Sequence, residues 1–265
     1  MLGAIVGDSV GSVYEFDNFK SKDFIPFAPY HGNYCFATDD SIMTLAIAKA
    51  VLETDKGNGT LPQNAVRYMQ GIGKQYPYCG FGGNFYCWIF SDDPKPYGSY
   101  GNGSAMRVSP VAYAAKSIEE AIHMADEVTC VTHSHPQGML GAEATAACVW
   151  LALHGHSRED IGQYVNAHFY KIDFTIDEIR PTYRFNETCQ DTVPQAIRAF
   201  LESTDFEDAL RTAVSVGGDS DTLAAITCSI AGAYYGVPQK IAEKASIFLD
   251  PDLLDILDDF EARFC

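Results

Sequence analysis

Residues 215–223, SVGGDSDTL, place two carboxylates and a hydroxyl directly before a long apolar stretch. Asp219 and Asp221 are separated by one residue, and Thr222 follows them. Acids at the start of a helix lie near its free N–H groups and its positive dipole end. Burying two acids so close together is costly unless a cation offsets their charge. The stretch therefore predicts either a metal site or a helix cap with a solvated acid.

A second stretch, residues 36–44 (FATDDSIMT), repeats this arrangement. Thr38 is a suitable N-cap, and Asp39 and Asp40 suit the first turn of the apolar helix that follows. One such stretch is well explained by capping alone. Two in one chain favour a shared function for their acids.

A helix is predicted over residues 2–16, where glycines recur at every fourth position. Such a smooth stripe lets another helix approach closely. Asp8, Ser12 and Glu15 recur at i, i+4 and i+7, so a helix would place them on one face. That face is either functional or the solvated side of the helix.

Together these stretches supply five carboxylates and two hydroxyls as candidate ligands. Carboxylates that converge without a cation would be forced in part to take up protons. Two divalent ions would nearly neutralise the group, and an all-oxygen donor set suits Mg²⁺ or Mn²⁺ rather than zinc or copper. The candidates are Glu15, Thr38, Asp39, Asp40, Asp219, Asp221 and Thr222.

Residues 80–103 are rich in Gly, Asn, Tyr and Pro and lead toward a helix, a combination that can hold a phosphate on backbone N–H groups. Tyr97 and Tyr100 either stack on a base or pack the loop. His133 and His135 suggest a zinc pair, but no other His or Cys lies at a usual ligand spacing. A hydrogen-bonding histidine at the rim of a site is the favoured interpretation.

Helical patterns fill most of the chain and strand signals are scarce, so we expect an all-α fold with one domain over residues 1–265. Residues 17–37 are expected to form a loop because they hold prolines, a glycine and several aromatics. Further helices are predicted at 61–76, at 117–128 with a Ser117–Glu120 capping box, at 158–170, and at 191–203 with Pro194 in the first turn.

The composition is that of a globular protein, with 47% hydrophobic residues and a net charge of −17. The excess of acids argues against nucleic acid or an anionic membrane as partner. The eight cysteines form no C-x-x-C pair, so buried free thiols are expected. The chain shows no secretory leader and no apolar run long enough for a membrane span, which favours a cytoplasmic protein.

The sequence resembles the ADP-ribosylglycohydrolases, a family that includes the hydrolase that reactivates ADP-ribosylated dinitrogenase reductase. The resemblance runs nearly end to end. It is carried by GAIVGDSVGSVYEF at 3–16, FATDDSIMT at 36–44, YGNGSAMRVSP at 100–110, THSHPQGMLGAEA at 132–144, DTVPQAIRAFLES at 191–203 and SVGGDSDTLAAITCSIAGAYYG at 215–236.

The resemblance implies a compact orthogonal helical bundle with a two-metal centre. Glu15 matches a glutamate near the second metal or its water, and His133 matches a residue that contacts ADP-ribose. Tyr100 would stack on adenine within a loop that wraps the diphosphate. By motif, the metal ligands are Thr38, Asp39, Asp40, Asp219, Asp221 and Thr222, and the loop is Ser99, Tyr100, Gly101, Asn102 and Gly103.

The resemblance further implies hydrolysis of the bond between ADP-ribose and a protein side chain, with arginine favoured as the acceptor. Glu15, Asp39 and Asp40 remain alternatives for the residue that accepts a proton. A serine linkage, O-acetyl-ADP-ribose, a non-catalytic ADP-ribose-binding protein and a two-metal phosphoesterase remain alternatives for the function. We expect a monomer whose partner is ADP-ribose or an ADP-ribosylated protein.

Overall fold

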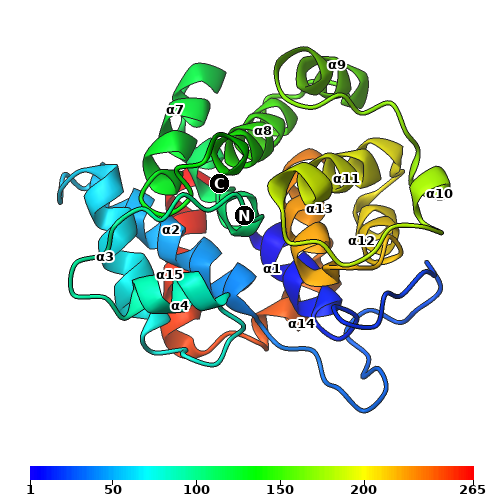
Figure 1. Ribbon diagram of the computed structural model, residues 1–265, viewed down its shortest axis with the longest axis horizontal. Coiled ribbons are helices and arrows are strands. Elements are labelled where there is room, and N and C mark those ends of the chain that lie inside the picture. Colours follow the sequence, from blue (N-terminus) through cyan, green and yellow to red (C-terminus); the bar gives the residue numbers. More distant parts are fainter.

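The computed structural model describes all 265 residues and consists of helices joined by loops and turns (Figure 1). No β-strand forms, and the β-type pairing consists of two isolated bridges, Tyr30–Asn33 and Gly101–Thr188. The all-α prediction is confirmed. The helices are α1 (Leu2–Gly11), α2 (Asp39–Asp55), α3 (Leu61–Gly73), α4 (Gly83–Ile89), α5 (Gly103–Met106), α6 (Pro110–Ala114), α7 (Ile118–Thr129), α8 (Pro136–Leu153), α9 (Arg158–His168), α10 (Ile176–Ile179), α11 (Cys189–Glu202), α12 (Phe206–Val214), α13 (Ser220–Tyr235), α14 (Gln239–Ser246) and α15 (Pro251–Phe264).

Helices α1 and α13 form the centre of the molecule and lie against each other (Figure 1). The predicted glycine stripe of α1 faces α13 directly. A Cβ atom at Gly7 would lie 2.1 Å from the Ala224 carbonyl oxygen, and one at Gly11 would lie 2.5 Å from the Asp221 Cα atom. Because no side chain fits at these positions, the two backbones approach as closely as the stripe predicts.

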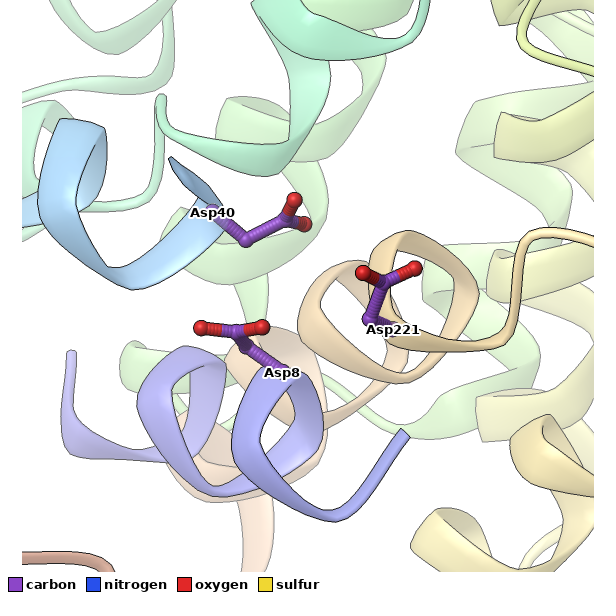
Figure 2. Close-up of side chains that lie close together, drawn as sticks. All are labelled: Asp8, Asp40 and Asp221. Atoms are coloured by element: carbon purple, nitrogen blue, oxygen red, sulfur yellow. The ribbon is translucent and has the colours of Figure 1, made fainter. Parts of the chain in front are cut away.

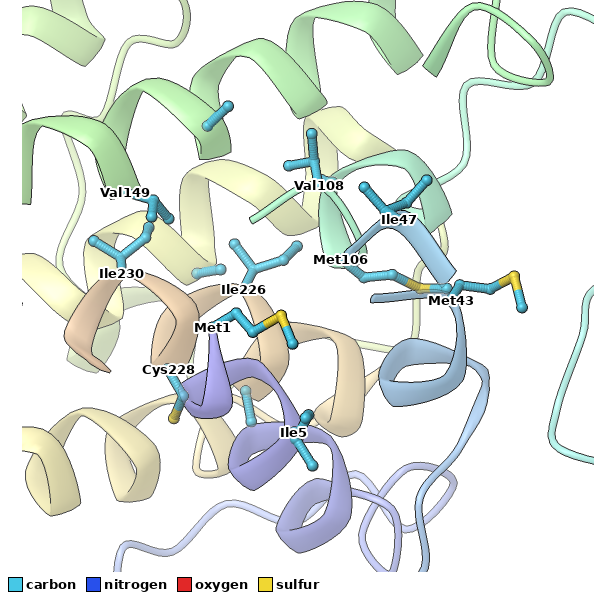
Figure 3. Close-up of a cluster of buried hydrophobic side chains, with 14 of the residues drawn as sticks. Met1, Ile5, Met43, Ile47, Met106, Val108, Val149, Ile226, Cys228 and Ile230 are labelled. Atoms are coloured by element: carbon cyan, nitrogen blue, oxygen red, sulfur yellow. The ribbon is translucent and has the colours of Figure 1, made fainter. Parts of the chain in front are cut away.

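Helix α13 is buried on every side along most of its length, as its apolar sequence predicts. Its Ile226 and Ile230 belong to a core that also holds Met43 and Ile47 of α2 and Val149 of α8 (Figure 3). The core therefore surrounds α13 and holds its N-terminal end in a fixed place. None of the helices has both the length and the apolar character that crossing a bilayer requires.

Residues 17–37 form turns and loop, as predicted. Lys20 attaches this loop to the rest of the molecule, because its Nζ donates to the carbonyl oxygen of Tyr183 at 2.9 Å and to that of Val216. The predicted free thiols are also found, since none of the eight cysteines forms a disulfide.

Several predicted boundaries need correction. Helix α1 ends at Gly11 and is followed by turns, so the helical face predicted for Asp8, Ser12 and Glu15 does not extend to Glu15. Helix α11 begins at Cys189, which leaves Pro194 inside the helix rather than in its first turn. The Cys189 amide donates to the Tyr100 carbonyl at 3.0 Å, a tertiary contact that the local sequence does not encode.

Two local details also differ from the prediction. The glycine-rich segment 80–103 contains the short helix α4. At the start of α7, the Ser117 side chain accepts from the Glu120 amide as predicted. The Glu120 carboxylate, however, accepts from the Lys116 amide, so the reciprocal half of the capping box is displaced by one residue.

Candidate active site

Asp8, on the last turn of α1, is fully buried and fixes the beginning of α2. Its carboxylate accepts from the Thr38 amide at 2.9 Å, the Thr38 hydroxyl at 2.7 Å and the Ser41 amide at 3.0 Å. The Ser41 hydroxyl donates to it as well. Asp8 therefore satisfies amides at the helix start that have no partner within the helix.

The acids of three helices converge where α1 ends and where α2 and α13 begin. Asp8, Asp40 and Asp221 each offer a carboxylate oxygen, and these oxygens lie within 4.8 Å of one another (Figure 2). A second group, Glu15, Asp219 and Asp221, meets the same distance. Asp221 belongs to both groups, so the two form one continuous acid cluster. Of the sequence-predicted acids, Glu15, Asp40, Asp219 and Asp221 are thus brought together, whereas Asp39 belongs to neither group.

The hydroxyl oxygens of Thr38 and Thr222, beside the cluster, could also coordinate a cation. Thr38 is the N-cap of α2: its Oγ1 donates to Asp8 and accepts from the Asp40 amide at 3.2 Å, which leaves one lone pair free. The Thr222 hydroxyl lies 3.3 Å from Asp40 Oδ2, to which it donates.

Asp39 lies beside Asp40 at the start of α2 but faces the cavity. Its amide donates to the Cys79 carbonyl at 3.1 Å. Gly80 has a φ of +123°, and a Cβ atom there would lie 2.8 Å from Asp39 Oδ1. Glycine at this position therefore leaves room for the carboxylate.

The raised pKa values of the clustered carboxyl groups show that burial and mutual repulsion disfavour their ionised forms. Burial, followed by repulsion from neighbouring carboxylates, raises the pKa of Glu15 to about 8 and that of Asp39 to about 7. Burial raises the pKa of Asp8 to about 6 against its four hydrogen bonds, which lower it. For Asp40 and Asp221, burial and adjacent carboxylates raise the pKa well above the usual range.

The donor set fits divalent cations. Asp40 Oδ1 is buried and has no hydrogen-bond partner, although buried carboxylate oxygens normally have one. All the side chains that converge here offer oxygen, the donor preferred by Mg²⁺ and Mn²⁺. His133 and His135 are not part of either acid group, and His135 instead caps α8 by accepting from the Gln137 amide at 3.1 Å.

The acid cluster opens into a cavity of about 290 Å³. Only three of its 20 lining residues are hydrophobic, so the cavity suits a polar ligand. From the acid cluster, the lining residues are Glu15, Asp39, Asp40, Asp219, Asp221 and Thr222.

The glycine-rich loop, Ser99–Gly103, lines the same cavity. Ser99, Gly101, Asn102 and Gly103 line the cavity together with His133. Two backbone hydrogen bonds hold this loop against residues 187–189, namely Asn102 N to Glu187 O at 2.8 Å and Cys189 N to Tyr100 O at 3.0 Å. The loop is therefore fixed in place before any ligand arrives.

Asn102 connects the loop to the acid cluster. Its side-chain nitrogen donates to Asp219 Oδ2 at 2.7 Å and to Thr192 Oγ1 at 3.1 Å. Tyr100, in contrast, is half exposed and packs near His135, with their ring centroids 5.2 Å apart. Tyr97 is the loop tyrosine that lines the cavity. The stacking of Tyr100 on adenine stays a prediction.

A family model described as ADP-ribosylglycohydrolase matches residues 1–263, nearly the whole chain. The chain belongs to the ADP-ribosylglycohydrolase family. Among curated proteins, ADP-ribosylhydrolase ARH3 of Xenopus tropicalis is 27% identical, with 90% of this chain and 87% of that protein aligned. ADP-ribosylarginine hydrolase Tri1 of Serratia proteamaculans is 25% identical, with 89% of this chain and 70% of that protein aligned.

The fold of this ADP-ribosylglycohydrolase agrees with that of a solved structure. A chain titled ADP-ribosylglycohydrolase-related protein complex superposes with a TM-score of 0.70 at 21% identity, covering 98% of this chain and 97% of that one. The resemblance expected from the sequence motifs is thereby confirmed, together with the compact helical fold.

Two residues of this ADP-ribosylglycohydrolase belong to the site although the sequence motifs do not identify them: Asp8 in the acid cluster and Arg107 in the cavity lining. Asp8 was placed on a helix face with Ser12 and Glu15, but its partner residues lie 30 and 33 positions further on. Arg107 lines the cavity beside Asp39 and is fully buried. A signal for Arg107 was present, since it lies four residues after Gly103 within the quoted motif YGNGSAMRVSP.

Proposed function

We propose that this chain is a metal-dependent hydrolase that cleaves the N- or O-glycosidic bond between ADP-ribose and a modified acceptor, releasing ADP-ribose. The observation that carries this proposal is a polar cavity lined both by the acid cluster and by a fixed glycine-rich loop. Such a cavity brings cation ligands and a polar loop to the same ligand, as a ribose linked to a diphosphate requires.

Two divalent ions, Mg²⁺ or Mn²⁺, would be held by Thr38, Asp39, Asp40, Asp219, Asp221 and Thr222, with Glu15 beside them. Asp221 supports a two-ion arrangement because its carboxylate belongs to both acid groups. When bound, such ions orient ribose hydroxyls and lower the pKa of a water molecule. Asp8 would act behind them by fixing Thr38 and the start of α2.

Side chains and backbone of the protein would carry out proton transfer, stabilisation of charge and binding of the diphosphate. Glu15, Asp39 and Asp40 are the three candidates for accepting a proton from water, because each lines the cavity. The surrounding carboxylates would stabilise positive charge that develops at the anomeric carbon. Ser99, Gly101, Asn102 and Gly103 would hold the diphosphate, with Tyr100 at its adenine end.

We propose arginine as the acceptor residue. The similarity to a protein named ADP-ribosylarginine hydrolase supports this choice. Glu15 and Asp39 also support it, since an acidic cavity mouth favours a cationic guanidinium leaving group over a neutral hydroxyl.

The test is to incubate the purified chain with arginine-linked and serine-linked ADP-ribosyl peptides and with O-acetyl-ADP-ribose, with and without Mg²⁺ or Mn²⁺. We expect metal-dependent release of ADP-ribose, fastest from the arginine linkage, and a fall of at least about 100-fold in Asp39→Ala and Asp221→Ala. Asp259→Ala, an exposed acid on α15, serves as control and should retain activity.

Other outcomes identify other functions. Release that is unaffected by EDTA contradicts the proposal. Calorimetric binding of ADP-ribose without turnover of any linkage identifies a non-catalytic ADP-ribose-binding protein. Phosphate release from simple esters, without release of ADP-ribose, identifies a phosphoesterase.

A further inference from the structure

Arg107 and His133, which line the cavity, are joined by hydrogen bonds through the buried Thr132. Arg107 Nη2 donates to Thr132 Oγ1 at 2.7 Å, and Thr132 Oγ1 lies 2.7 Å from His133 Nδ1. All three residues are almost completely buried. What each atom can donate or accept limits the possible directions of these two hydrogen bonds.

Arg107 determines which atoms donate and which accept in these hydrogen bonds. A guanidinium can only donate, so Thr132 Oγ1 must accept from Arg107. The single hydroxyl proton of Thr132 then has two acceptors within reach: His133 Nδ1 at 2.7 Å and the Thr129 carbonyl oxygen at 3.4 Å. A proton on His133 Nδ1 would leave the Thr132 hydroxyl only the long contact to Thr129, so the geometry favours donation from Thr132 to Nδ1, which then carries no proton of its own.

We propose that Arg107 and Thr132 are positioning residues that hold His133 as the neutral tautomer with its proton on Nε2, ready to donate to an oxygen of ADP-ribose. The role toward ADP-ribose rests on the proposed function, whereas the tautomer is a property of the free protein. The ring is kept neutral because burial, and then the nearby Arg107 cation, lower the pKa of His133 well below its usual range.

The glycine-rich loop leaves space around the proposed donor. Cβ atoms at Gly103 and Gly101 would lie 3.4 and 3.8 Å from His133 Nε2, and both glycines line the cavity with His133. The Tyr97 amide also donates to the Thr132 carbonyl at 3.2 Å, which ties the loop to the same segment. A ligand oxygen held by the loop would thus meet a donor whose direction is already fixed, an arrangement that reduces the ordering cost of binding.

The tautomer is tested without substrate by long-range ¹H–¹⁵N spectra of the wild-type protein at neutral pH, with histidine rings labelled and His133 assigned through His133→Gln. We expect one protonated nitrogen at Nε2 and one unprotonated nitrogen at Nδ1. A proton on Nδ1, protonation of both nitrogens, or averaging between the two tautomers overturns the proposal.

The role in binding is tested with Thr132→Val, which keeps the side-chain shape but removes the hydroxyl. We expect loss of the single tautomer and a Kd for ADP-ribose raised about tenfold, with kcat changed less than the KM of the modified peptide. Thr132→Ser should restore both the tautomer and the Kd. Thr129→Val is the matched control, because the Thr129 hydroxyl is buried nearby and has no partner.

The outcomes separate this proposal from the proposed function. An unchanged tautomer and Kd in Thr132→Val overturn the positioning role. If Thr132→Val fails to fold, the wild-type spectrum decides the tautomer, and Thr132→Ala, which also lacks the hydroxyl, decides the binding role against Thr132→Ser. If the wild type binds ADP-ribose but hydrolyses no linkage, the proposed function fails while the tautomer and its effect on Kd still stand.

Discussion

Asp40 is a residue whose buried carboxylate would lower the stability of the fold while contributing to the candidate site. One of its carboxylate oxygens is buried without a hydrogen-bond partner, and other carboxylates surround it. A buried charge of this kind destabilises a protein unless a counter-charge is present. A bound cation would supply that counter-charge, and this is the explanation we favour for an acid at this position.

Asp40→Asn should therefore separate stability from function. The amide oxygen can still accept from Thr222, while the charge is removed. We expect the metal-free variant at pH 8 to be more stable than the wild type by about 1–2 kcal/mol. In the same variant, activity should fall by at least about 100-fold. Calorimetry in EDTA and the peptide assay measure the two effects, with Asp259→Asn on α15 as control. Lower stability of metal-free Asp40→Asn would contradict this explanation.

The candidate site was predictable residue by residue only where chemistry and local pattern coincide. The local sequence is enough to identify four of the acids, because each follows a hydroxyl residue or glycines at the start of an apolar helix: Asp39, Asp40, Asp219 and Asp221. Asp8 could not be assigned in that way, because its role depends on contacts with Thr38 and Ser41 across a loop. Such contacts are properties of the tertiary structure.

At the scale of elements, the α1–α13 contact positions the acid cluster. Gly11 packs on the backbone of Asp221, so the distance between the two helices also sets the distance between Asp8 and Asp221. The twin positive φ values of Gly217 and Gly218, both +73°, turn the chain into α13 just before Asp219. A side chain at either glycine would be strained and would displace that acid.

Gly7→Ala should destabilise the protein by about 1–3 kcal/mol or more, because its Cβ atom would lie 2.1 Å from the Ala224 carbonyl oxygen and the helices would have to separate. Gly71→Ala is the matched control on α3, where a Cβ atom meets nothing within 4 Å. That substitution should stabilise the protein by about 0.5–1 kcal/mol. Urea denaturation measures both. Equal effects of the two substitutions would show that the close helix contact does not form.

The elements themselves were largely predictable because buried helices have a strong apolar period. Their ends were less so. Helix α11 starts before its proline signal because Thr188 and Cys189 pair with the glycine-rich loop. Helix α4 forms in a segment whose composition favours loop, where Phe85 and Trp88 bury their rings. Tertiary burial outweighs local propensity in both cases.

At the scale of the whole molecule, the acid cluster couples stability to pH and to divalent cations. The folded-state pKa values of about 6 for Asp8, 7 for Asp39 and 8 for Glu15 lie above their unfolded values. Groups of this kind contribute their full stability below the unfolded pKa, near pH 4, and that stability is lost as pH rises through the folded pKa. A bound cation reverses this loss, because it favours the ionised carboxylates.

The rise in Tm on adding Mn²⁺ or Mg²⁺ should therefore increase steadily from pH 5 to pH 8. The Met1 amine titrates in the opposite sense, since burial lowers its pKa to about 6, but it contributes equally with and without metal and cancels in the difference. Thermal scans in EDTA and in excess metal at each pH provide the measurement. A metal-induced shift that is the same at pH 5 and pH 8 would contradict the clustered burial of these acids.

The order in which the chain is synthesised gives the contact between α1 and α13 a further consequence. Helix α1 leaves the ribosome well before α13, yet α13 covers its glycine face and carries Asp221, the acid that completes the group of Asp8 and Asp40. A nascent chain that stops short of α13 has neither a closed core nor a complete set of ligands. Closure of the core and assembly of the acid cluster are thus one late event, so the cluster would be complete for a cation only once the fold has formed.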